Sequence, residues 1–183
     1  MIVNMYEEIT DGFICKVICS GEEMIDDIKK KIRQHQLELI RQKESDVFKS
    51  EAIYVASMPG QNDVRELGKT NHDLHDVMSR YHHLLYEQQM NEKKSLELLN
   101  EKLETINRIR ICVLYLSSEE EETIFFLYRV PNAYKKGVGD VMRRYNTSEA
   151  TVKRWRRSAL KKVKELYSSD KSNTALLEDL KIQ

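Results

Sequence analysis

The stretch of sequence that organises this chain runs from Ser117 to Leu166 and reads SSEEEETIFFLYRVPNAYKKGVGDVMRRYNTSEATVKRWRRSALKKVKEL. Its apolar residues recur at intervals of three and four, which is the spacing of one face of an α-helix. Breaks in this pattern fall at Pro131 and at the segment Tyr145-Asn146-Thr147-Ser148. The pattern therefore predicts three helices joined by two turns.

The first predicted helix has a start signal and a stop signal. Ser118 and Glu121 have the spacing of a capping box, in which each side chain accepts a hydrogen bond from the other residue's backbone amide. Pro131 marks the end, because proline lacks the amide hydrogen that a continuing helix needs. The inward face of this helix is expected to carry Ile124, Leu127 and Tyr128.

The second and third helices are predicted from about Gly137 to Tyr145 and from Ser148 to Glu165. Ser148 is an N-cap candidate, because its hydroxyl can accept a hydrogen bond from a free amide of the first turn. Asn146 suits the corner between them, since asparagine tolerates the left-handed conformation of a tight turn. The expected buried faces carry Val138, Val141 and Met142 on the second helix, and Val152, Trp155, Ala159 and Val163 on the third.

This region is strongly basic. From Lys135 to Glu165 there are eleven Lys or Arg and three acidic residues, a formal charge of +8, and because the whole chain is neutral the remainder carries −8. A basic patch on an otherwise acidic protein is typical of proteins that bind a phosphate backbone, although a merely solvated basic helix is the alternative. A short helix pair with a basic second helix predicts a helix-turn-helix that inserts this helix into the DNA major groove.

The same stretch resembles region four of bacterial sigma factors, and more closely the phage regulators of the RinA and ArpU type. The resemblance is carried by a hydrophobic helix, by the predicted recognition helix and by the tail of that helix. In this chain these are Ile124-Phe125-Phe126-Leu127-Tyr128-Arg129-Val130, Ser148-Glu149-Ala150-Thr151-Val152-Lys153-Arg154-Trp155 and Ala159-Leu160-Lys161-Lys162-Val163. The Tyr128-Arg129 pair inverts the order found in these families, and the connection from Pro131 to Gly137 is longer than theirs.

The resemblance implies a sequence-specific transcriptional regulator that binds double-stranded DNA in the cytoplasm of a bacterial host, as an activator of phage late genes acting with RNA polymerase. Sigma factors read bases with the positions that are Glu149, Ala150, Lys153 and Arg154 here. A glutamate can accept a hydrogen bond from cytosine, an alanine can contact the thymine methyl group, and Lys or Arg can donate to guanine. The other expected DNA contacts are Ser148 at the helix start and, as phosphate ligands, Arg144, Arg156, Arg157, Lys161, Lys135 and Lys136.

Two other functions fit the same residues. A phage small terminase subunit also joins a DNA-binding helix-turn-helix to a coiled-coil oligomerisation region, and would form a ring-shaped oligomer. A protein that mimics sigma region four could instead bind polymerase without reading DNA. The sequence contains no Gly-rich phosphate loop and no nucleophile elbow, so we expect no enzyme and no cofactor.

The composition favours long helices. The chain has 183 residues, of which 40% are hydrophobic and 33% charged, with only six Gly and two Pro. No apolar run approaches the roughly 18 residues that a membrane span needs, and the first residues lack the features of a signal peptide. The three cysteines form no metal motif or disulfide framework, which suits a reducing cytoplasm.

The region before Ser117 is expected to be mostly helical. Residues 1–20 are rich in β-branched and aromatic types around Asp11-Gly12, which predicts a small β-hairpin. Residues 22–45 carry a heptad pattern at Ile25, Ile28, Ile32, His35 and Leu39, and a break follows from Ser45 to Thr70 with a turn at Met58–Asp63. A second helical pattern from about Asn71 to Leu116 is weakened near Gln88–Asn91 and would pack antiparallel on the first, or on a second copy.

The expected fold class is therefore mainly α, with a helical hairpin or coiled-coil region before a C-terminal helix-turn-helix domain. The domain plan gives residues 1–20 a β-hairpin, 21–116 an antiparallel helical region with a loop near 56–70, 117–167 the DNA-binding domain, and 168–183 a tail. A homodimer is favoured, because regulators of two-fold sites need one. His35 is either a pH-sensitive or ligand-binding position, or a residue tolerated at the edge of the seam.

A group of histidines and carboxylates resembles a metal site. It consists of His72, Asp73, His75, Asp76, His82 and His83. Zinc needs three or four ligands that converge on one point, and on a helix His83 and Asp73 point away from the other members. We therefore expect a polar helix face here and no metal.

Overall fold

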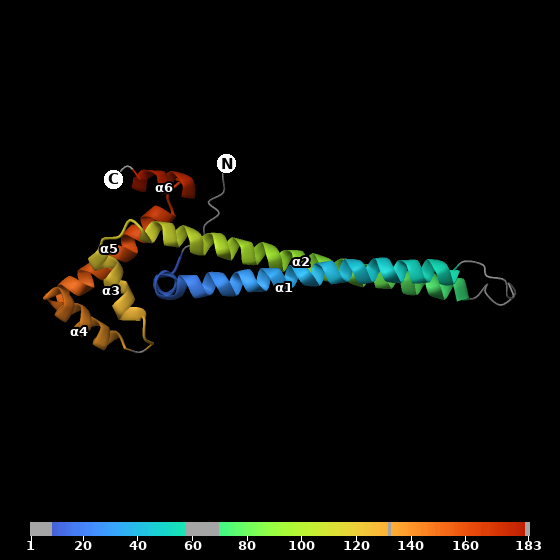
Figure 1. Cartoon of the computed structure of the whole chain (residues 1–183), viewed down its shortest axis with the longest axis horizontal. Coiled ribbons are helices and arrows are strands. Elements are labelled where there is room, and N and C mark those ends of the chain that lie inside the picture. Colours follow the sequence, from blue (N-terminus) through green and yellow to red (C-terminus); the bar gives the residue numbers. More distant parts are fainter. Residues whose placement is uncertain (1–8, 58–69, 132, 182–183) are drawn as a thin grey trace. The chain divides into compact units, whose positions relative to one another are not determined.

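The structure is a computed structural model that describes residues 9–57, 70–131 and 133–181. Helices make up its regular structure, and no strand occurs among these residues, so the expectation of a mainly α protein is confirmed. The helices, shown in Figure 1, are α1 (Asp11–Ser57), α2 (Thr70–Val113), α3 (Ser118–Tyr128), α4 (Tyr134–Tyr145), α5 (Glu149–Tyr167) and α6 (Asn173–Lys181).

The chain divides into two compact units. Unit 1 consists of Met1–Asp27 and Lys102–Gln183, and unit 2 consists of Ile28–Glu101. The long helices α1 and α2 therefore each contribute to both units. Unit 1 contains α3 to α6 together with the first turns of α1 and the last turns of α2.

The β-hairpin predicted for residues 1–20 is wrong in its described second half, because Asp11–Ser20 form the first turns of α1. Thr10 explains this start: its hydroxyl accepts a hydrogen bond from the amide of Phe13 at 3.3 Å, as an N-cap does. Ile14 and Val17 are buried one helical turn apart. Burial at helical spacing overrides the strand propensity of these β-branched residues. Residues 1–8 lie outside the described residues.

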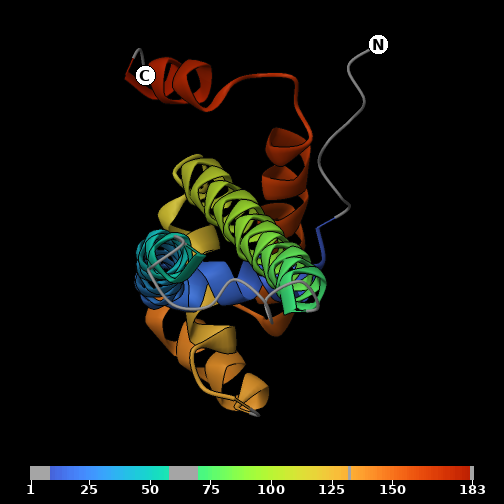
Figure 2. The ribbon, with the colours of Figure 1, turned by 90° about the vertical axis from the view of Figure 1, so that its right-hand side faces the viewer.

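A kink at Ser20 divides α1. The backbone there is not helical (φ −141°, ψ 26°), and the hydroxyl of Ser20 donates a hydrogen bond to the carbonyl of Lys16 at 3.0 Å. Serine side chains that bond back to the preceding turn favour such bends. Figure 2 shows that the segments of α1 before and after Ser20 run in different directions.

Both long helices are more continuous than the sequence pattern indicates. The break predicted from Ser45 is wrong at its start, since α1 continues to Ser57, and α2 runs without interruption through Gln88–Asn91. The predicted turn at Met58–Asp63 lies outside the described residues. Neither Ser45–Ser57 nor Gln88–Asn91 contains Gly or Pro, so helical hydrogen bonds continue through both segments although the apolar spacing is interrupted there.

In unit 2, α1 and α2 lie side by side at one point defined by His35. Its Nδ1 is 2.5 Å from Oε2 of Glu92 on α2, and both side chains are partly exposed. Several large apolar side chains of this unit are more than half exposed, namely Leu37, Ile40, Leu84, Tyr86 and Leu98. The antiparallel hairpin and the homodimer remain predictions for this unit.

The start of α3 lies one residue earlier than predicted. The capping box consists of Ser117 and Glu120, not Ser118 and Glu121: the Ser117 hydroxyl accepts from the Glu120 amide at 3.3 Å, and the Glu120 carboxylate accepts from the Ser117 amide at 3.2 Å. The tertiary structure decides between these adjacent pairs. Glu120 is buried and also binds Lys162 of α5 at 2.7 Å, whereas Glu121 is exposed.

Helices α3, α4 and α5 pack against one another around a small apolar cluster. Its buried members come from all three helices, and three of them, Val138, Val141 and Val152, are among the residues predicted to face inward. The cluster contains Leu127, Val138, Val141 and Val152, with Phe126, Tyr128, Met142, Tyr145 and Trp155 packed partly buried around it. The Trp155 and Tyr145 rings meet edge to face with centroids 5.5 Å apart, so Trp155 belongs to this core.

Gly137 permits the close approach of α4 to α3. A Cβ atom at this position would lie 2.3 Å from the carbonyl oxygen of Phe126 and 3.0 Å from the Cα of Leu127. Both neighbours are backbone atoms, which cannot move aside without shifting a helix. Helix α4 begins at Tyr134, three residues before the predicted start, so Gly137 lies within the helix, where the close packing on α3 leaves no room for a side chain.

Buried Arg108 of α2 holds the end of the chain in place. Its guanidinium donates to the carbonyl oxygens of Tyr167 (2.8 Å), Ser169 (2.7 Å) and Lys171 (2.9 Å), and to Oδ1 of Asn173 (3.1 Å). These acceptors lie at the end of α5, in the connection to α6 and at the first residue of α6. An arginine is suited to this role because it offers five donors and no acceptor.

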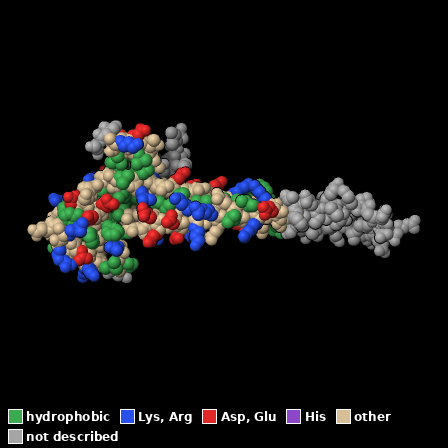
Figure 3. Space-filling model, viewed as in Figure 1, with side chains coloured by type: hydrophobic (Ala, Val, Ile, Leu, Met, Phe, Trp, Pro, Cys, Tyr) green, Lys and Arg blue, Asp and Glu red, His purple; other side chains and the backbone are tan. Residues whose placement is uncertain are grey.

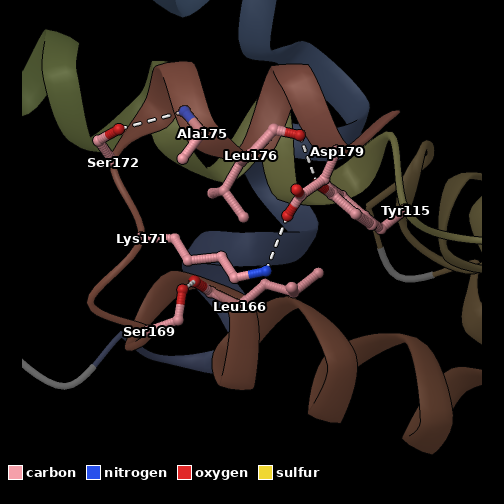
Figure 4. Close-up of polar contacts among 8 residues, drawn as sticks. All are labelled: Tyr115, Leu166, Ser169, Lys171, Ser172, Ala175, Leu176 and Asp179. Carbon is pink, nitrogen blue, oxygen red and sulfur yellow. Dashed lines mark hydrogen bonds and ion pairs between the residues drawn. The ribbon is translucent and has the colours of Figure 1, made fainter. Parts of the chain in front are cut away.

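Helix α6 occupies part of the segment predicted to be a tail. Leu176 is fully buried, and its carbonyl oxygen accepts a hydrogen bond from the Tyr115 hydroxyl. Lys171 and Asp179 form an ion pair at 2.7 Å across the turn (Figure 4). The hydroxyl of Ser172 accepts from the amide of Ala175 at 3.1 Å and caps the helix.

We predict that Gly137→Ala lowers the free energy of unfolding of unit 1 by about 2 kcal/mol or more, because the added methyl group overpacks a rigid contact. Gly139→Ala on the same helix is the matched control: its Cβ would meet nothing within 4 Å, so a gain of about 0.4–1 kcal/mol is expected. Urea unfolding followed by fluorescence of Trp155, the single tryptophan, measures both. Equal effects of the two substitutions would contradict the close α3–α4 contact.

We also predict that Arg108→Met lowers the free energy of unfolding of unit 1 by about 3 kcal/mol or more, since several charge-assisted hydrogen bonds are lost at a buried site. Arg110→Met, on the same helix, removes one exposed ion pair with Glu22 and should cost less than about 1 kcal/mol. Amide hydrogen exchange of Asn173–Lys181 should accelerate only in the Arg108 variant. Unchanged protection of this helix would show that Arg108 does not anchor it.

Candidate nucleic-acid interface

The corner between α4 and α5 is tightly defined. Asn146 adopts the left-handed conformation (φ 46°, ψ 50°), as its residue type predicts, and its amide and that of Thr147 bond to the carbonyl of Met142. The Ser148 hydroxyl then accepts from the amide of Thr151 at 3.3 Å, which confirms it as the N-cap of α5. These bonds fix the direction in which α5 leaves α4.

The buried face of α5 decides which of its side chains face outward. Val152, Ala159 and Val163 are buried with at most 1% of their surface exposed. On the opposite face, six residues spaced by three and four positions line a shallow hollow, which we term the α5 hollow. Its residues are Ala150, Lys153, Arg154, Arg157, Ser158 and Lys161, of which four are cationic and none acidic.

The cations of the α5 hollow are available to a ligand. Arg154 and Arg157 are exposed and form no ion pair with any described residue. Lys153 pairs with Glu149 at 2.7 Å, and Lys161 with Glu165 at 3.6 Å, but both are exposed pairs one helical turn apart. Exposed pairs of this kind are weak and exchange readily for another anion. The hydrogen bond to Lys153 lowers the pKa of Glu149 and raises that of Lys153, so both are charged at neutral pH.

Arg156, predicted to bind phosphate, lies elsewhere. It is partly buried, donates from Nε to the hydroxyl of Tyr128 at 2.6 Å, and its guanidinium lies 5.7 Å from the centre of that ring. Arg156 therefore connects α5 to α3 and does not line the α5 hollow. Burial raises the pKa of the Tyr128 hydroxyl, although the hydrogen bond from Arg156 opposes that shift.

The remaining predicted phosphate ligands lie on α4. Lys135 and Lys136 are exposed in its first turn. Arg144 is exposed but pairs with Glu122 of α3 at 2.5 Å, and its guanidinium lies 5.7 Å from the ring of Phe126. The structure does not bring these three residues into the α5 hollow. In the space-filling view, Lys and Arg side chains are visible over α4 and α5 (Figure 3).

One residue of the α5 hollow, Ser158, was not predicted from the sequence. Ser158 lies in it and also forms a hydrogen bond with the buried carboxylate of Glu120. Its position four residues after Arg154 was the signal that could have identified it. Glu149, Ala150, Lys153, Arg154, Arg157 and Lys161 are all exposed as expected of residues that contact a ligand.

Other candidate sites receive no support from the described residues. The side chains of His72, Asp73, His75 and Asp76 lie outside them, and no metal-ligating group of three or more side chains forms elsewhere in the described part. The cysteines are free thiols, and burial raises the pKa of Cys15 and Cys112 to about 11, so neither is a reactive thiolate. None of the described helices has both the length and the apolar character required to cross a bilayer.

Comparisons of the chain with protein-family models, with curated proteins and with solved structures give no match.

Proposed function

We propose that the chain is a sequence-specific DNA-binding protein that regulates transcription, and that α4, the corner at Asn146 and α5 act as its helix-turn-helix. The observation that carries this proposal is the α5 hollow, where four cations and no carboxylate line the outer face of a helix. A duplex presents phosphates along both edges of its major groove, and an α-helix fits between them.

The first turns of α5 are the part that would read bases. Glu149, Ala150, Lys153 and Arg154 are exposed there, on the side away from buried Val152. In a recognition helix, N-terminal residues contact base edges. The Arg154 guanidinium can donate two hydrogen bonds to guanine, and the Ala150 methyl group can contact thymine. The Glu149 carboxylate can accept from cytosine once Lys153 turns toward phosphate.

Phosphate contacts would fix the register of this helix on the duplex. Arg157 and Lys161 lie one and two turns beyond Arg154 on the same face, where the groove wall and its phosphates are the nearer partners. Lys135 and Lys136 on α4 supply further exposed positive charge, and Arg144 is also exposed but is paired with Glu122. Arg156 is omitted from this set, because it is held against Tyr128.

Partners beyond DNA rest on the resemblance of residues 117–166 alone. By that resemblance the protein would activate phage late genes together with RNA polymerase. A homodimer would place two copies of α5 on the half-sites of a two-fold operator. Unit 2 would supply the dimer contact through its exposed apolar side chains.

We predict that the full chain binds duplex DNA with strong salt dependence. With about six phosphate contacts, a plot of log affinity against log salt concentration should have a slope of about −5. The experiment is a fluorescence anisotropy titration of a random-sequence duplex at several salt concentrations. Lys31→Ala is the control variant, because Lys31 is an exposed cation on α1 in unit 2 and not a residue of the α5 hollow. A salt-independent affinity would remove the proposal of DNA binding.

A second prediction separates base reading from phosphate binding. Selection of bound sequences from a random duplex pool provides the preferred site. On this site Arg154→Ala should cost about 1–3 kcal/mol, with little effect on scrambled DNA. Arg157→Ala, its matched control on the same face, should weaken binding to both duplexes similarly and make the salt slope shallower by about one unit.

The two titrations also test whether α5 lies in the DNA groove in the proposed position. If Arg154→Ala weakens binding to the selected and the scrambled duplex equally, Arg154 contacts phosphate and α5 lies in the groove differently from the proposal. If the random pool yields no enriched sequence although binding is salt-dependent, the protein binds DNA without reading bases.

A further inference from the structure

Unit 1 contains a second hollow, next to the kink of α1, which shares no residue with the α5 hollow. It has a volume of about 350 Å³. We term it the kink hollow. Its walls come from α1 on both sides of Ser20, from the end of α2 and from the first turn of α3, and its residues are Val17, Ile18, Cys19, Ser20, Gly21, Glu22, Glu23, Arg110, Val113, Leu114 and Glu121.

The floor of the kink hollow is apolar. Val17, Ile18 and Val113 contribute aliphatic surface, and Leu114 leaves 60% of its surface exposed. Leu114 follows directly after the end of α2, and its amide bonds to the carbonyl of Ile111 in the closing turn. The backbone thereby leaves the large apolar side chain of Leu114 exposed to solvent within the kink hollow, which is typical of an interaction site.

The rim of the kink hollow is acidic. Glu22, Glu23 and Glu121 are exposed there, and Arg110 is its single cation. Arg110 is paired with Glu22 at 3.1 Å, so the carboxylates of Glu23 and Glu121 remain uncompensated at the rim. This negative charge excludes a nucleic acid as the occupant, because phosphates would be repelled.

We propose that the kink hollow is a docking site for a basic amphipathic segment of a partner protein. An apolar side chain of the partner would occupy the floor beside Leu114, and Lys or Arg residues flanking it would pair with Glu23 and Glu121. Helical segments that dock in this way present apolar residues at intervals of three and four. The chain's own N-terminal segment is an unsuitable occupant, since Glu7 and Glu8 precede α1. This site is independent of the proposed DNA contact through α5.

The experiment uses the full chain and a fluorescein-labelled peptide of Leu and Lys with Leu at helical spacing as the probe. Anisotropy should show saturable binding, and a peptide with Glu in place of Lys should not bind. Glu23→Lys with Glu121→Lys should weaken binding by about tenfold or more, and Leu114→Ala by about fivefold, as expected for truncation of an apolar contact.

The matched control carries the same change in charge outside the kink hollow. Glu104→Lys with Glu178→Lys alters two exposed acids of unit 1 and should change peptide affinity by less than about twofold. Equal weakening by both double variants, or no saturable binding of the Leu/Lys peptide, overturns the proposal. Self-association of the unmodified chain that is lost in Glu23→Lys with Glu121→Lys would assign the site to a second copy instead, which also overturns it.

Circular dichroism and DNA binding separate these outcomes from misfolding and from failure of the proposed function. Leu114 and the rim carboxylates are exposed, so the variants should unfold like the unmodified chain. Their salt slope on random duplex should also be unchanged. Loss of peptide binding with normal DNA binding in these variants supports the docking site. If the unmodified chain binds the peptide but not DNA, the proposed function is wrong and the docking site is still supported.

Discussion

The burial of Val152 between α3 and α4 is the constraint on which the proposed interface depends. Val152 shares its apolar cluster with Leu127 and Val141, so the rotation of α5 about its own axis is fixed within its first turn. Because side chains on a helix project at fixed angular intervals, this one contact determines that Ala150, Lys153, Arg154 and Arg157 face solvent together. The close α3–α4 contact at Gly137 maintains the geometry of the cluster.

Polar contacts around this cluster assign different roles to cations that look equivalent in the sequence. Lys162 binds buried Glu120, and Arg156 binds the Tyr128 hydroxyl, so both connect α5 to α3. Arg154 and Arg157 form no ion pair with any described residue and remain available to a ligand. A buried carboxylate such as Glu120 must be paired because desolvation penalises its charge, and this requirement explains why Lys162 is not part of the α5 hollow.

Unit 1 therefore separates its charges by position. Cations gather on the outer face of α5, whereas carboxylates surround the apolar floor of the kink hollow. The same separation is present in the sequence as a +8 segment within a neutral chain. A molecule arranged in this way can attract a polyanion to one surface and a basic protein segment to another, because the two hollows share no residue and carry charge of opposite sign.

The sequence by itself determined the mainly helical class, the N-cap at Ser148, the left-handed corner at Asn146 and the buried faces of α4 and α5, because these depend on local hydrogen bonds and helical spacing. Only the tertiary structure decided that residues 11–20 are helical, that Glu120 rather than Glu121 closes the capping box, and that α6 packs through Arg108. In each case the deciding contacts come from residues distant in sequence. Ile14 and Val17 are buried within unit 1, Glu120 pairs with the ammonium of Lys162, and Arg108 donates to carbonyls about sixty positions later. The spacing of neighbouring residues in the sequence does not indicate which distant residues will make these contacts.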